Sequence, residues 1–107
     1  MSQLWISAGL KVHEGKSAQQ AKQALLELQQ ASGKEAGCIY FHVLQHRDNP
    51  ELFTLWEEWE SEADLITHFE LEHTKAYMAQ SLTEVIYIEK LVKQTCCIAL
   101  HMPYVCL

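Results

Sequence analysis

The sequence predicts one α+β domain, and three features carry that prediction. Four segments are hydrophobic runs or alternate hydrophobic and polar residues, as strands do. Two regions repeat hydrophobic residues at three- and four-residue steps, as helices do. The chain has 107 residues, of which 49% are hydrophobic, which suits a single folded core. We expect residues 1–92 to form this domain.

The first strand is expected over residues 4–13, where every second residue is hydrophobic. A polar turn containing Gly15 separates it from the first helix. Ser17 and Gln20 have the spacing of a helix-capping box, and Gly33 stands where a C-terminal cap belongs. The residues between them predict a helix with one buried face.

The middle of the chain predicts a hairpin and then a second helical region. Residues 37–46 and 52–60 are hydrophobic strands, and the turn-forming residues between them favour antiparallel pairing. Ser61 caps a helix that either continues to about Ser81 or kinks near residues 70–71.

A fourth strand at residues 83–91 completes the order β-α-β-β-α-β, which is that of a ferredoxin-like fold with an antiparallel sheet. A sheet with helices on one face normally leaves its other face polar. Here the two hairpin strands carry aromatic and branched side chains on both faces. A second copy of the sheet is the simplest cover, so the pattern predicts a homodimer.

Composition excludes several classes of partner. The net charge is −6 and the eight basic residues are scattered, so the footprint of a nucleic-acid binder is missing. No segment approaches the ~20 apolar residues that a bilayer requires, and the N-terminus lacks the pattern of a signal peptide. We therefore expect a cytoplasmic protein that contacts no membrane.

Residues 93–107 form a hydrophobic, cysteine-rich tail. A free tail of this composition would aggregate, so we expect it to pack as an extra strand across the dimer or over a sheet edge. The four cysteines of the chain form no C-x-x-C pair, which favours reduced thiols over a redox or zinc motif.

The signature region of the antibiotic-biosynthesis-monooxygenase superfamily resembles residues 56–77, WEEWESEADLITHFELEHTKAY. Its pattern is a strand E-x-W, then S-x-x-x-L, then two helix histidines before an aromatic residue. The matching positions are Glu57, Trp59, Ser61, Leu65, His68, His73 and Tyr77. Upstream, residues 35–38 (EAGC) resemble the E-x-G-C start of the second strand in quinol-monooxygenase-like members. The resemblance spans roughly residues 4–91.

This resemblance implies a dimeric α/β barrel, in which two ferredoxin-like sheets face each other and the helices lie outside. Such relatives include cofactor-free oxygenases of phenols and quinols, heme-degrading enzymes and an isomerase of a small phosphorylated sugar-like signal. The heme-degrading members carry an asparagine where this chain has Ala8, and a tryptophan near the position of His68. We therefore do not expect heme breakdown.

Cofactor-free oxygenation needs a base to deprotonate a phenol or quinol, and an apolar pocket that excludes water. His68 is the candidate base, because histidine titrates near neutral pH and this one lies near the apolar side of its helix. Glu57 is the candidate that orients it. The alternative is a structural hydrogen bond from His68 to Glu57 or Glu72. We expect His73 at a helix junction or at the pocket mouth.

Aromatic residues supply candidate walls for a flat substrate, with ordinary core packing as the alternative. They are Trp59, Phe69, Tyr77 and Tyr40. His42 shares a strand face with Tyr40, which places it either in the pocket or in the dimer interface. His68 and Glu72 have no third residue at zinc-site spacing, so we expect no metal and no cofactor.

The sequence therefore favours a cofactor-independent monooxygenase acting on a small aromatic quinol or phenol, with O₂ as the second substrate. Two alternatives stay open. One is a non-catalytic dimer that binds a small ligand or acts in a stress response. The other is an isomerase of a small carbonyl compound, which needs the same histidine but no O₂.

Overall fold

One antiparallel sheet carries the fold, with its strands in the order β2-β3-β1-β4. The structure is a computed structural model and describes residues 3–94. Its elements are β1 (Leu4–Val12), α1 (Ala18–Ser32), β2 (Cys38–Gln45), β3 (Leu52–Trp59), α2 (Glu62–Glu70), α3 (Glu72–Ala79) and β4 (Thr83–Leu91). The predicted ferredoxin-like α+β fold is confirmed. The predicted tail lies outside the described residues except for its first two.

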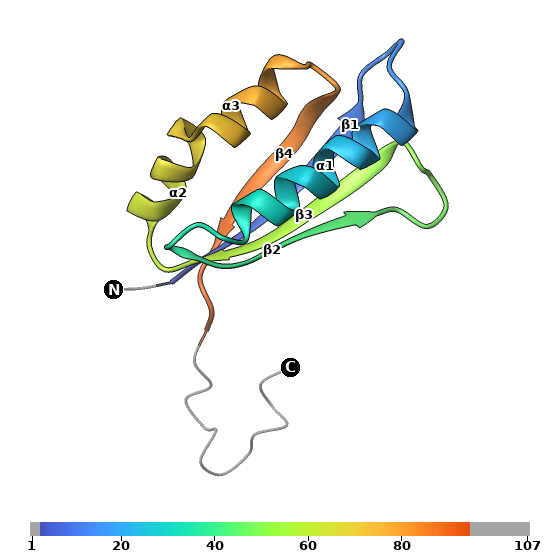
Figure 1. Cartoon of the computed structure of the whole chain (residues 1–107). Helices are drawn as coiled ribbons and strands as arrows, with labels where there is room; N and C mark the ends of the chain where they lie inside the picture. The colour runs from blue at the N-terminus through green and yellow to red at the C-terminus, as the bar shows by residue number, and fades with distance from the viewer. Residues whose placement is uncertain (1–2, 95–107) are drawn as a thin grey trace.

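All three helices cover the same face of the sheet (Figure 1). The Ser17 hydroxyl accepts a hydrogen bond from the backbone N–H of Gln20 at 3.1 Å, as the capping spacing predicts. The backbone of Leu71 is extended (φ −81°, ψ 153°), so the second helical region is two helices. Among residues 3–94, no helix has the length and apolar content to cross a bilayer.

The hydrophobic core lies between the sheet and the helices. Alternate residues of β1 face the helices and are buried, as the period of two predicts. Phe53 and Trp59 from β3 and Leu25 from α1 are almost completely buried. Each contributes roughly 1.5–3 kcal/mol through burial.

The opposite face of the sheet is free of helices and carries a cluster of aromatic side chains. The Trp56 indole N–H donates to the Tyr40 hydroxyl at 2.8 Å, and the rings of Trp5 and Trp56 lie 6.0 Å apart. Tyr87 and Leu91 of β4 belong to the same face, and both are more than one-third exposed. The helix-free face therefore carries aromatic side chains as well, which is the feature on which the dimer prediction rests.

Candidate active site

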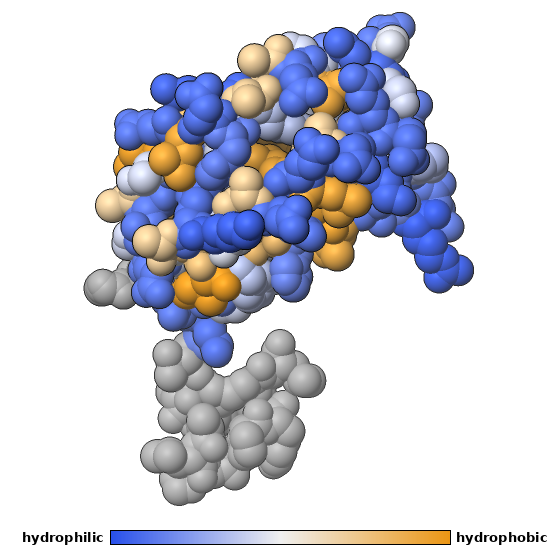
Figure 2. Space-filling view, in the orientation of Figure 1, coloured by the Kyte–Doolittle hydropathy of each residue, from blue (hydrophilic) through white to orange (hydrophobic). Residues whose placement is uncertain are grey.

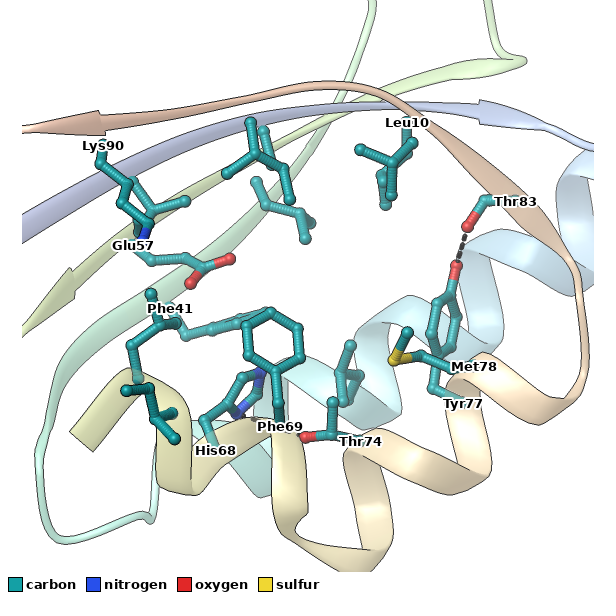
Figure 3. Close-up of a pocket in the computed structure, with 18 of the residues that line it drawn as sticks. Leu10, Phe41, Glu57, His68, Phe69, Thr74, Tyr77, Met78, Thr83 and Lys90 are labelled. Atoms are coloured by element: carbon teal, nitrogen blue, oxygen red, sulfur yellow. Dashed lines mark hydrogen bonds between the residues drawn. The ribbon is translucent and has the colours of Figure 1, made fainter. Parts of the chain in front are cut away.

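A cavity of about 350 Å³ lies between the sheet and the helices α2 and α3. Figure 3 shows side chains of both layers converging on it. Most of its walls are hydrophobic. Its polar lining residues are Glu57, Glu62, His68, Thr74, Tyr77, Thr83 and Lys90. A small-molecule site typically has a volume of about 300–1,000 Å³ and mostly apolar walls. The cavity has both properties.

The cavity is bordered by apolar side chains of the edge strand β4 and of α2 and α3 that remain about half exposed. These are Ile66, Phe69, Met78, Val85 and Ile88. Figure 2 views the helical side and shows hydrophobic side chains between α1 and the α2–α3 pair, surrounded by hydrophilic residues. An apolar ligand would meet matching surface on its way in.

Two polar links join β4 to the helices. At one end, Lys90 Nζ lies 2.7 Å from Glu62 Oε2 on α2. At the other end, the hydroxyls of Tyr77 on α3 and Thr83 on β4 hydrogen-bond to each other (Figure 3). The ion pair is more than half exposed on both sides, and such pairs contribute at most about 1 kcal/mol. The ion pair therefore adds little to the attachment of β4 to α2.

His68 lies on the helical side of the cavity, beside Phe69 and Thr74 (Figure 3). Its side chain is 4% exposed, and its Nδ1 atom lies 2.7 Å from Oε2 of Glu35. Burial lowers the pKa of His68, while the hydrogen bond and the charge of Glu35 raise it in part. The polar contacts of the ring with Glu35 and with Thr74 are both made by Nδ1.

Glu57 projects into the cavity from the sheet, opposite His68 (Figure 3). It is 5% exposed, and its Oε1 atom accepts a hydrogen bond from the indole N–H of Trp59 at 2.8 Å. Burial raises the pKa of Glu57 from 4.5 to about 7; the Trp59 hydrogen bond opposes this and the charge of Glu35 adds to it. A carboxyl group with this pKa can both accept and donate a proton at neutral pH.

Glu35, His68 and His73 are of the residue types that bind transition metals, and their donor atoms cluster. However, both histidine nitrogens lie only 2.6–2.7 Å from one carboxylate oxygen. Ligands around a tetrahedral zinc at ~2.1 Å are roughly 3.4 Å apart. The nitrogen–oxygen distances in this cluster are therefore those of hydrogen bonds, and they are shorter than the distances between ligands of a bound zinc ion.

Cys38, on β2, is the one cysteine in the described part of the chain, residues 3–94. Burial raises the pKa of its thiol to about 11, with smaller contributions from the charges of Glu35 and Glu57. It therefore remains protonated at neutral pH and is a poor nucleophile.

The cavity brings together four of the predicted site residues, and these are His68, Glu57, Phe69 and Tyr77. Trp59 is fully buried next to it and contacts Glu57 through its indole N–H. His73 lies in the first turn of α3 and hydrogen-bonds to Glu35. Neither Trp59 nor His73 forms part of the cavity wall.

Tyr40 and His42 do not reach the cavity. Strand register pairs His42 with Trp56, on the helix-free face of the sheet, and the rings of Tyr40 and His42 lie 4.7 Å apart there. His42 therefore does not line the cavity. Of its two predicted locations, the dimer interface is the one that stays a prediction.

The expected partner of His68 requires a correction. Glu57 makes no hydrogen bond to His68 within residues 3–94, and the carboxylate that does is Glu35, from the loop between α1 and β2. Sequence reasoning missed this contact because Glu35 is 33 residues away in the chain. The sequence signal for it is EAGC at residues 35–38, which by itself indicates only the family resemblance.

Comparison with known proteins agrees with this fold. Residues 6–80 match the family described as antibiotic biosynthesis monooxygenase. The chain belongs to this family. It is also 33% identical over 90 residues to the uncharacterized protein YjcS of Bacillus subtilis (strain 168), which covers 84% of this chain and 86% of YjcS.

Solved structures of the family superpose closely on this monooxygenase-family chain. The structure named protein YJCS has a TM-score of 0.80 and 32% identity, and covers 87% of this chain and 100% of its own. PA3566 from Pseudomonas aeruginosa has a TM-score of 0.80 and 26% identity, covering 89% and 97%. SnoaB, a cofactor-independent oxygenase from Streptomyces nogalater, shares the fold at 8% identity (TM-score 0.77, covering 91% and 98%).

Proposed function

We propose that this chain is a cofactor-independent monooxygenase that oxidises a small aromatic quinol or phenol. One observation carries the proposal: a single apolar cavity holds a buried histidine on its helical side and, opposite it, a buried carboxyl group with a pKa of about 7. Membership of a family described by monooxygenase activity supports the same reaction class.

The two groups divide the proton transfers between them. His68 Nε2 takes the hydroxyl proton of the substrate, and the resulting anion gives one electron to O₂. The superoxide and the substrate radical combine, which forms a C–O bond and a peroxide anion. Protonated Glu57 gives its proton to the peroxide.

The second half of the reaction restores both residues. The Glu57 carboxylate takes the C–H proton from the peroxide-bearing carbon while the O–O bond breaks and a C=O bond forms. His68 returns its proton to the departing hydroxide, which becomes water. One oxygen atom of O₂ ends in the product and the other in water, so atoms, protons and electrons balance.

The hydrophobic walls serve the same chemistry. They keep water away from the substrate anion, which water would otherwise reprotonate before the anion reacts with O₂. Phe69, which lines the cavity beside His68, presents an aromatic surface on which a flat ring can pack.

The test is oxygen uptake by the purified protein with a panel of reduced naphthoquinols and anthrones. We expect uptake above the spontaneous rate in the wild type and a loss of about 10²-fold or more in His68→Ala. His13→Ala is the matched control, because His13 is exposed and lies outside the cavity. Tight binding of a panel compound that stays chemically unchanged in air would refute the oxygenase and favour a binding protein.

We further infer that the active form is a homodimer joined through the helix-free face of the sheet. The support is the aromatic cluster of Trp5, Tyr40 and Trp56, together with the exposed side chains of Tyr87 and Leu91 on the same face. A second sheet would cover this surface, and the cavities lie on the other side.

A further inference from the structure

Three segments that are distant in the chain meet at one carboxylate oxygen. Glu35 Oε2 lies 2.7 Å from Nδ1 of His68 on α2 and 2.6 Å from Nε2 of His73 on α3. The Glu35 side chain is 7% exposed, and that of His73 is 29% exposed. Glu35 thus links the buried His68, which lines the cavity, to the partly exposed His73.

The backbone places Glu35 for this role. Its own N–H donates to the Ser32 carbonyl at 3.1 Å, and its carbonyl accepts from the Cys38 N–H at 3.0 Å. Two residues on, Gly37 approaches α2 so closely that a β-carbon there would lie 2.1 Å from Asp64 Cγ. The loop can therefore rest against the start of α2, four residues before His68.

The chemistry of the shared oxygen decides which nitrogen of His68 carries the proton. An ionised carboxylate is only an acceptor, so each nitrogen that contacts it must be N–H. In the neutral imidazole of His68, a proton on Nδ1 leaves the lone pair on Nε2. The Thr74 hydroxyl, 3.3 Å from the same Nδ1, is a further polar neighbour.

We propose that Glu35 and His73 are positioning residues that hold His68 in its Nδ1–H tautomer and so make Nε2 the base of the cavity. His73 provides the second N–H donor, which fixes the carboxylate against rotation away from His68. When His68 takes a proton, the Glu35 charge stabilises the imidazolium. The catalytic part of this inference rests on the proposed function, whereas the tautomer is a property of the free protein.

The tautomer is measured directly by long-range ¹H–¹⁵N correlation spectra of the histidine rings of the full chain. We expect a protonated Nδ1 and an unprotonated Nε2 for His68 in the wild type. Glu35→Leu should convert His68 to the Nε2–H form or to a mixture of tautomers. Glu35→Gln keeps an acceptor oxygen without the charge, so it should keep the tautomer while the pKa of His68 falls.

The control is Glu72→Gln, which removes an exposed carboxylate next to His73 but no hydrogen bond to the group. It should leave both the tautomer and the pKa of His68 unchanged. His73→Phe should retain the tautomer only in part. A Nε2–H tautomer in the wild type, no change in Glu35→Leu, or metal-bound nitrogen signals on both histidines would each overturn the proposal.

Turnover separates this inference from the proposed function. If the wild type consumes O₂ with a panel substrate, Glu35→Leu should lower kcat by about tenfold or more, with a smaller effect on KM. If the spectra agree with the Nδ1–H tautomer but no panel substrate is turned over, the positioning role stands and the monooxygenase assignment loses its support.

Discussion

Replacement of Glu57 by glutamine should change how the stability of the protein depends on pH. Burial raises the pKa of Glu57 from 4.5 to about 7 in the folded chain. Below pH 4.5 the carboxyl is protonated in both the folded and the unfolded state, and no penalty arises. As the pH rises toward 7, the unfolded chain releases this proton first, so folding becomes less favourable.

The size of the effect follows from the displacement of the pKa. At about 1.4 kcal/mol for each pH unit, the free energy of unfolding of the wild type should fall by about 3 kcal/mol relative to Glu57→Gln between pH 4.5 and 7.5. The glutamine keeps a carbonyl oxygen for the Trp59 indole N–H, so packing is preserved. His68, whose pKa is lowered, acts in the opposite direction in both proteins and cancels in the difference.

The assay is urea unfolding of both proteins from pH 4.5 to 8 at one protein concentration, because unfolding of a dimer depends on concentration. Glu60→Gln, at an exposed position just after β3, shows the general effect of losing one negative charge. If wild type and Glu57→Gln run parallel across this range, Glu57 is not a buried group that titrates near neutral pH, and its role as proton donor fails.

Two further changes test the packing on which the site depends. Gly37→Ala should destabilise the fold by about 1–3 kcal/mol in urea unfolding, because its β-carbon would overlap the Asp64 side chain. Gly33→Ala is the milder control, because the nearest atom to a β-carbon there is 3.3 Å away. Equal stability of the two variants would contradict the predicted overlap at Gly37. Trp56→Glu should convert the protein from dimer to monomer, because it places a charge in the helix-free face. Size-exclusion chromatography with light scattering measures this change, and a monomeric wild type would refute the proposed interface.

Much of the fold could be predicted from the sequence because each element follows a local rule. The period of two in β1 and the capping residue Ser17 each depend on neighbours within a few positions. The break at Leu71 was one of two alternatives, since Glu70 and Leu71 are both acceptable helix formers. Its extended backbone brings His73 and Thr74 beside His68, which is a consequence of tertiary packing.

The site could be predicted only in part, for the same reason. His68 and Glu57 lie in a recognisable run of residues, whereas the partner of His68 comes from a loop before β2. Strand alternation placed Tyr40 and His42 on one face together, but it could not show which face the helices cover. Which face the helices cover depends on the whole topology. In this fold Tyr40 and His42 lie on the helix-free face, away from the cavity.

Glu35 and Glu57 differ in their surroundings, and that difference supports the different roles that we propose for them. Glu35 receives two N–H donors and borders the partly exposed His73, which favours a fixed charge that orients its neighbour. Glu57 receives one donor and faces apolar walls, which favours a group that gains and loses a proton near neutral pH. A reaction that must first remove a proton from the substrate and later return one to oxygen requires both groups, which is why we assign orientation to Glu35 and proton transfer to Glu57 and His68.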